Sequence, residues 1–192
     1  MHPCLIVNGI WGTTEQLKPL HEHLSTDRTV CSLVFADASG RSPILSLAHE
    51  VKAACDALLA GSDASRCDIV GFSMGALATR VFIQKLDGKE TVRRYISISG
   101  PHHGSLNAYA LPHEGVRDMR PNSTLLRDLH ADPNPFGKVE VHCIYTPFDI
   151  TILPPRSSVL QQSKSVTSIP VPLHGMVIRD ARVMTLVREL LT

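Results

Sequence analysis

The chain has 192 residues, of which 43% are hydrophobic and 19% are charged, and its formal net charge at pH 7 is +1. This length and composition favour one globular domain, 1–192, that buries about 70% of its unfolded surface and needs no disulfide or structural metal. The nearly neutral charge, without any block of like charges, argues against nucleic acid or an anionic membrane as a partner.

Apolar runs alternate with amphipathic runs along the chain and predict strands and helices in turn. The predicted strands are 4–7, 29–35, 67–70, 92–99, 139–145 and 166–171. The predicted helices start near residue 14 and then cover 44–59, 76–83, 123–129 and 176–191. Most of these strands are apolar throughout, which is typical of a parallel sheet with helices on both faces. We therefore predict an α/β fold, a three-layer α/β/α sandwich with a mostly parallel sheet of about six strands.

The stretch 100–122 shows no clear hydrophobic period. It is long for a connection in a compact domain, and connections of this length often carry function. We expect it to form a lid or a wall of a pocket.

The cysteines are odd in number and form no C-x-x-C pair, so we predict buried, reduced thiols. They are Cys4, Cys31, Cys55, Cys67 and Cys143. No basic leader, cleavage site or long apolar segment is visible in the sequence. We therefore expect a cytoplasmic protein without a stable membrane anchor.

The five residues Gly71-Phe72-Ser73-Met74-Gly75 follow the pattern G-x-S-x-G between a predicted strand and a predicted helix. In that context the pattern is typical of a nucleophile elbow, in which a strained turn projects the serine hydroxyl above the sheet. Gly71 and Gly75 have no Cβ atom, so strand and helix can approach closely. The helix N-terminus would offer amide groups to an oxyanion. The alternative is a turn that only connects the two elements.

A serine hydroxyl is a weak nucleophile unless a base accepts its proton and an acid orients that base. His174 follows the last predicted strand, and Asp149 follows the strand at 139–145. In a parallel sheet these strand ends share one edge with Ser73. The competing interpretations are a turn residue for Asp149 and a residue at the edge of the core for His174.

With these residues in order, the chain resembles the α/β-hydrolase superfamily, and in particular small bacterial serine lipases and esterases with a minimal cap. Residues 8–12 resemble the H-G-x-x-G oxyanion segment of that family. Residues 149–155 resemble its acid loop, and 174–176 its histidine loop. Residues 99–105 resemble a lipase loop that follows the strand after the elbow.

The resemblance implies roles for individual residues. Ser73 would be the nucleophile, His174 the general base and then acid, and Asp149 the orienting carboxylate. The backbone N–H groups of Ile10 and Met74 would form the oxyanion hole.

The apolar residues next to these motifs are expected to bind substrate. They are Trp11, Phe72, Phe148 and Met176. The chain departs from the family pattern at Asn8, where the family has histidine, and we expect a local hydrogen-bonding role for this side chain. It also lacks the two leading antiparallel strands of larger members.

The resemblance thus implies a serine hydrolase that cleaves carboxylic esters through an acyl-serine intermediate, with a small-molecule ester or a lipid as substrate. A thioesterase, an amidase or an acyltransferase could use the same triad, and a non-catalytic binding module is the alternative of another class. We expect no cofactor. We also expect no metal site at His102 and His103, because adjacent residues rarely ligate one ion together. The acyl chain length and the oligomeric state stay open.

Overall fold

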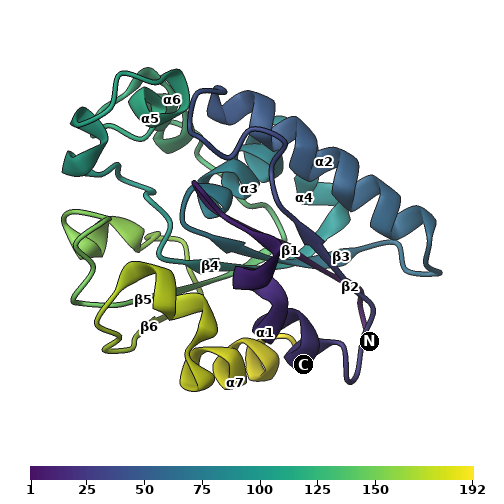
Figure 1. Cartoon of the computed structure of the whole chain (residues 1–192). Coiled ribbons are helices and arrows are strands. Elements are labelled where there is room, and N and C mark those ends of the chain that lie inside the picture. The colour runs from purple at the N-terminus through teal and green to yellow at the C-terminus, as the bar shows by residue number, and fades with distance from the viewer.

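In the computed structural model, which describes residues 1–192, six strands form one parallel sheet (Figure 1). The strands are β1 (Cys4–Val7), β2 (Val30–Leu33), β3 (Cys67–Phe72), β4 (Val92–Ile98), β5 (Glu140–Tyr145) and β6 (Ser165–Ser168). Their order in the sheet is β2-β1-β3-β4-β5-β6, and every neighbouring pair is parallel. The predicted α/β sandwich is confirmed.

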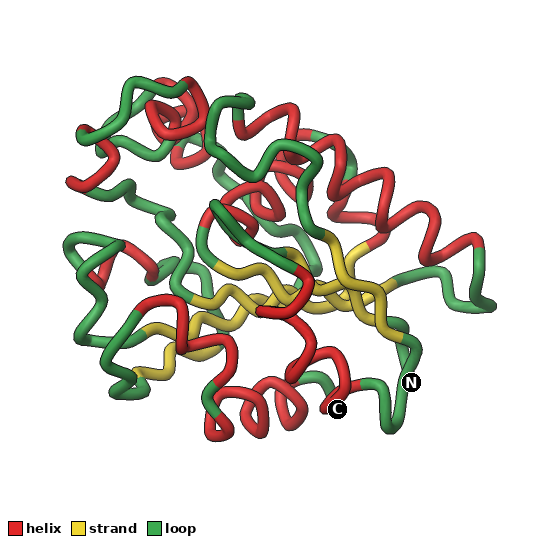
Figure 2. Tube along the Cα trace, in the orientation of Figure 1, coloured by secondary structure: helices red, strands yellow, loops and turns green.

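Helices cover both faces of the sheet (Figure 2). The α-helices are α1 (Thr14–Leu24), α2 (Ile44–Ala60), α3 (Met74–Lys85), α4 (Gly88–Thr91), α5 (Glu114–Asp118), α6 (Thr124–His130) and α7 (Ala181–Leu190). Three short 3-10 helices are η1 (Leu106–Tyr109), η2 (Pro155–Ser158) and η3 (His174–Arg179). Helices α2 and α3 pack on one face, whereas α1 and α7 pack on the other (Figure 1). None of the helices combines the length and the apolar character that crossing a membrane requires.

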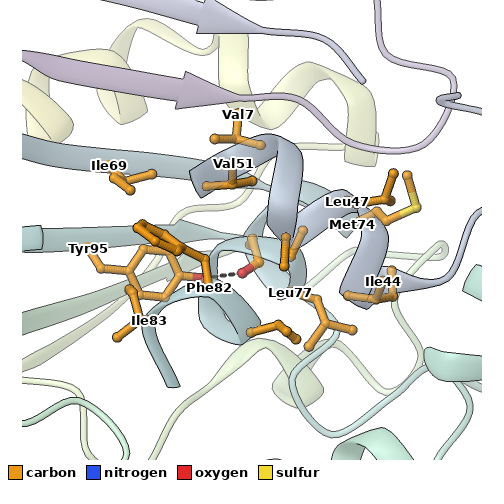
Figure 3. Close-up of a cluster of buried hydrophobic side chains, with 14 of the residues drawn as sticks. Val7, Ile44, Leu47, Val51, Ile69, Met74, Leu77, Phe82, Ile83 and Tyr95 are labelled. Carbon is orange, nitrogen blue, oxygen red and sulfur yellow. Dashed lines mark hydrogen bonds between the residues drawn. The ribbon is translucent and has the colours of Figure 1, made fainter. Parts of the chain in front are cut away.

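The sheet divides the hydrophobic core in two. On the α2–α3 side, Val7 and Ile69 from the strands meet Val51 of α2 and Leu77 of α3 (Figure 3). The hydroxyl of Tyr95, on β4, donates a hydrogen bond of 2.6 Å to the carbonyl of Ala76. This bond joins the sheet to the first turns of α3. On the other side, the apolar stripes of α1 and α7 are buried against the sheet.

The topology puts a crevice at the carboxyl ends of β1 and β3. The chain leaves β1 toward β2 but leaves β3 toward β4, so the connections diverge between these two neighbours. Ligands of open α/β sheets bind at such a switch point. The connections on this edge lie at the left of Figure 1, away from both termini.

Two predicted boundaries were wrong by three residues or more. The closing helix begins at Ala181 and not at Met176, because the side chain of Asp180 caps α7 by accepting from the amide of Arg182. The last strand ends at Ser168, before Pro170, which has no amide to donate to a ladder. The amide of Val171 instead donates to the hydroxyl of Thr146.

The five cysteines are free thiols. Four of them are buried, as predicted, and Cys31 is half-buried.

We expect Tyr95→Phe to lower the free energy of unfolding by about 1 kcal/mol, because a buried hydrogen bond is lost at nearly constant volume. Urea titration monitored by circular dichroism measures this change. The matched control is Tyr145→Phe, whose hydroxyl makes no hydrogen bond within the chain and whose effect should stay within about 0.5 kcal/mol. Equal losses in the two variants would contradict the role given to the bond.

Candidate active site

Ser73 occupies the sharp turn between β3 and α3. Its φ of 54° and ψ of −126° lie in a region that residues with a Cβ atom rarely adopt. The turn is held in place because the amide of Ser73 donates to the carbonyl of Ile98, at the end of β4. The side chain is nearly buried, at 4% exposure. This is the geometry of a nucleophile elbow.

The two glycines of the elbow are explained by close backbone contacts. A Cβ atom at Gly75 would overlap the carbonyl oxygen of Asn8 and lie 2.8 Å from that of Val7. A Cβ atom at Gly71 would lie 2.7 Å from Cα of Ala76. Because Gly75 has no Cβ atom, the elbow can contact the end of β1. Because Gly71 has none, β3 can contact α3. Glycine is therefore a steric requirement at both positions.

His174 and Asp149 form a hydrogen-bonded pair, with 2.7 Å between His174 Nδ1 and Asp149 Oδ2. The other carboxylate oxygen, Oδ1, accepts from the amides of Thr151 and Ile152, each at 2.9 Å. Burial by itself raises the pKa of Asp149, but the hydrogen bond from His174 and these amides outweigh it and lower the pKa. Because an ionised carboxylate only accepts hydrogen bonds, Nδ1 of His174 must carry the proton.

The opposite nitrogen of His174 is thereby left as an acceptor. Nε2 is buried and has no hydrogen-bond partner within the chain. The ring of Phe72 stacks on the imidazole, with 4.9 Å between the two ring centroids. Asp149 and Phe72 therefore fix the orientation of this nitrogen, which is a hydrogen-bond acceptor in this tautomer.

Two cavities meet at Ser73. The first, of about 370 Å³, is lined mainly by apolar residues, among them Ala108, Leu111, Val116 and Met119. The second, of about 300 Å³, is lined by Ser73 together with residues that include Phe72, Leu173 and His174. Ile10, Trp11, Ser73 and Thr151 line both. A molecule that spans the two cavities would place its central bond at the serine.

Two backbone amides near the elbow have no hydrogen-bond partner within the chain, those of Ile10 and Met74. Their neighbours are engaged, since Gly9 donates to the side chain of Asn8 and Trp11 donates to the carbonyl of Ala38. A Cβ atom at Gly9 would lie 2.7 Å from Cβ of Ser73, so the turn after β1 contacts the elbow directly. The two amides that the sequence singled out are thus free donors beside the serine.

Asn8 closes the turn that carries Ile10. Its Oδ1 accepts from the amide of Gly9 at 2.8 Å, and its Nδ2 donates to the carbonyl of Thr13 at 2.9 Å. Gly12 packs directly on this side chain, which is fully buried. Asn8 therefore makes local hydrogen bonds of the kind expected from the sequence.

Two residues predicted to bind substrate do not reach the cavities. Phe148 is 58% exposed and Met176 is 51% exposed, and neither lines a cavity beside Ser73. They were chosen because they adjoin Asp149 and His174 in sequence, but consecutive residues of a turn point in different directions. Trp11 lines both cavities, and Phe72 lies beneath the imidazole.

The segment 100–122 forms one wall of the larger cavity, and the sequence alone gave no geometry for it. Ser105 ties it to the acid loop, because its hydroxyl donates to the carbonyl of Thr151 and accepts from the amide of Leu153. Asp118 ties its other end to α2 by accepting from the amide of Ile44. The wall is thus joined by hydrogen bonds to the loop that holds Asp149.

His102 and His103 point apart. Nε2 of His102 lies 2.6 Å from the hydroxyl of Ser97, and full burial holds the pKa of His102 well below its usual value. The ring of His103 stacks on His130. No group of three or more His, Cys, Asp or Glu side chains is placed to hold a metal ion.

A parallel sheet with a strained serine at the turn after β3, and an Asp–His pair at later strand ends, has the architecture of the α/β-hydrolase superfamily. The model of the palmitoyl protein thioesterase family matches residues 3–133, which is more than half of the chain. The chain therefore belongs to the palmitoyl protein thioesterase family. The matched segment includes Ser73 and ends before Asp149 and His174.

Solved structures confirm the fold. Aspergillus fumigatus lipase B superposes with a TM-score of 0.80 at 19% identity, over 99% of this chain and 52% of the lipase. A Bacillus licheniformis lipase in its mature form gives 0.82 at 12% identity, over 100% and 92% of the two chains. A gene product of Listeria innocua gives 0.72 at 14% identity, over 97% and 92%. The chain thus spans about half of the Aspergillus lipase. No curated protein sequence matches it.

We expect Gly75→Ala to destabilise the fold by at least about 2 kcal/mol, because the added methyl group meets backbone oxygens that cannot move independently. Gly61→Ala is the matched control, since Gly61 has a φ of −89° and the nearest atom to an added Cβ is 3.7 Å away. Its effect should stay within about 0.5 kcal/mol. Urea titration compares the two variants, and similar losses would contradict the packing argument.

The lowered pKa of Asp149 predicts how its contribution to stability depends on pH. A carboxyl whose pKa is lower in the folded state stabilises it fully above the unfolded-state value, about 3.9, and loses this contribution as the pH falls further. The difference in unfolding free energy between the wild type and Asp149→Asn should therefore be constant above about pH 5 and shrink below about pH 4. A difference that stays constant down to pH 3 in urea titrations would contradict the assignment.

Proposed function

We propose that Ser73, His174 and Asp149 act as a catalytic triad and that the chain is a serine hydrolase of carboxylic esters. The observation that carries this proposal is the orientation of His174. Its Nδ1 is bound to Asp149 at 2.7 Å, while its unpaired Nε2 is buried beside a cavity that Ser73 also lines.

The reaction proceeds in two halves. The hydroxyl of Ser73 attacks the ester carbonyl carbon while Nε2 of His174 accepts its proton. The free amides of Ile10 and Met74 donate hydrogen bonds to the oxyanion. His174 then gives the proton to the departing alcohol, which leaves an acyl-Ser73 ester. A water molecule attacks this ester by the same steps and releases the acid.

The two cavities suit the two parts of such a substrate. The cavity of about 370 Å³ has apolar walls and would hold the acyl chain. The cavity of about 300 Å³ adjoins His174 and would hold the leaving group, which receives its proton there. This arrangement keeps the scissile bond between Ser73 and His174.

A thioester is the second candidate substrate, and the match to the palmitoyl protein thioesterase family favours it. The same steps apply, with a thiol as the leaving group. A thiol leaving group needs less protonation by His174, because a thiolate leaves more readily than an alkoxide. The amides of the oxyanion hole would bind the oxyanion formed from either substrate. The choice between the two depends on relative turnover.

We expect purified protein to hydrolyse p-nitrophenyl esters within a series from acetate to palmitate, and Ser73→Ala to lose about 10⁴-fold or more of that rate. Ser158→Ala, which alters another buried serine whose hydroxyl makes no hydrogen bond, should keep the wild-type rate. A fluorophosphonate should label the wild type and Ser158→Ala but not Ser73→Ala.

Parallel assays with acyl thioesters of the same chain lengths decide between the two substrate classes. Higher kcat/KM for the thioesters would establish the second candidate. Full activity or labelling in Ser73→Ala would overturn the assigned nucleophile.

A further inference from the structure

The backbone ladder between β5 and β6 ends before the two loops that carry Asp149 and His174. Its last bond runs from the amide of Ile169 to the carbonyl of Tyr145, at 2.9 Å. The next residue, Pro170, has no amide to donate. No backbone hydrogen bond joins the loop 146–149 to the loop 171–174. The separation of the two loops is therefore set by side chains.

The hydroxyl of Thr146 replaces the missing backbone bonds. It donates to the carbonyl of Val171 at 2.7 Å and accepts from the amide of the same residue at 3.0 Å. It also accepts from the amide of Phe148 at 3.3 Å. A hydroxyl has one hydrogen to donate and two lone pairs, so these three bonds use its full capacity.

Thr146 is linked to both members of the Asp–His pair. Asp149 lies three residues after Thr146 and donates its amide to the carbonyl of Thr146 at 3.3 Å. His174 lies three residues after Val171. Apart from the bond between Asp149 and His174 themselves, the bonds of the Thr146 hydroxyl are the only hydrogen bonds between the two loops.

Filling the core does not account for a hydroxyl at this position. The side chain of Thr146 is fully buried, and Val171 is 1% exposed. Burying a hydroxyl is costly unless it is hydrogen-bonded, and an apolar side chain would fill the space without that cost. What the hydroxyl adds is the connection between the two loops.

We propose that Thr146 is a positioning residue, whose hydroxyl fixes the separation of the two loops at which Nδ1 of His174 bonds Asp149. The importance of this role for catalysis rests on the proposed function, whereas the geometry exists without a reaction. Loss of the hydroxyl leaves the amide and the carbonyl of Val171 without partners, and the loops separate. The bond between His174 and Asp149 then lengthens, and Nε2 loses its orientation toward the cavity that Ser73 lines.

Proton NMR of the Nδ1–H group of His174 tests the geometry without a substrate. A proton in a short hydrogen bond to a carboxylate resonates far downfield, and His174 is the one histidine paired with a carboxylate. We expect this resonance in the wild type and in Thr146→Ser, which keeps the hydroxyl. It should move upfield or disappear in Thr146→Val and in Thr146→Ala, which both lack the hydroxyl. Loss of the signal in His174→Asn assigns it.

Thr79→Val is the matched control for the loss of a buried threonine hydroxyl. Thr79 is also fully buried, and its hydroxyl donates to the carbonyl of Gly75 at 2.8 Å. It makes no bond to either loop, so Thr79→Val should keep the resonance at its wild-type position.

Kinetics with p-nitrophenyl esters test the consequence for the proposed reaction. Thr146→Val should lower kcat by about 10²-fold, because a small misplacement of a catalytic group has an effect of this size. KM should stay within about twofold, since Thr146 lines neither cavity beside Ser73. Thr146→Ser should keep kcat within about threefold of the wild type. Urea titration of each variant shows that the losses do not reflect unfolding.

The proposal is overturned if the wild type has no downfield resonance, or if Thr146→Val and Thr146→Ala keep it at the wild-type position. It is also overturned if Thr79→Val loses the resonance, or if kcat falls equally in Thr146→Ser and Thr146→Val. A chain that hydrolyses no ester but whose resonance responds as expected would contradict the proposed function and still support the role of Thr146.

Discussion

The close approach of the elbow to the end of β1 is the constraint on which the site depends. Gly75 lies against the carbonyls of Val7 and Asn8, and Gly9 lies against Ser73. These contacts permit the strained backbone of Ser73 and bring the free amides of Ile10 and Met74 to the same place. Strand order makes this possible, since β1 and β3 are neighbours in the sheet although some sixty residues separate them in the chain.

The orientation of His174 depends on a second set of contacts, made by loops far from the elbow in sequence. Asp149 is fixed by the amides of Thr151 and Ile152, and the same loop is bound by Ser105 from the cavity wall. One hydrogen-bonded unit therefore includes both the wall of the larger cavity and the carboxylate that orients the imidazole. The same loop thus holds the wall of that cavity and the carboxylate that orients His174.

The hydrophobic periodicity of the sequence predicted those features of the fold that depend on local sequence alone. All six strands and the order of Ser73, Asp149 and His174 could be read from apolar runs and from the residues that follow them. The start of α7 could not, because residues 176–179 keep an apolar pattern while the capping side chain of Asp180 sets the boundary. Phe148 and Met176 were misplaced because position next to a functional residue does not give side-chain direction. The wall 100–122 is fixed by bonds to distant segments, for which a single sequence carries no periodic signal.

The edge of the sheet that carries the site shows why the composition of a chain and its local surface can differ. Net charge sums over the whole chain, and here nearly equal numbers of acidic and basic residues cancel. Folding pairs many of these charges with each other, so the field outside depends on the residues left unpaired. In a parallel sheet every connection from a strand end starts at one edge, and here most of the exposed large apolar side chains lie on or beside those connections. The same topology that assembles a site from distant segments therefore also gives that site a surface of its own, with a polarity that the average composition does not reveal.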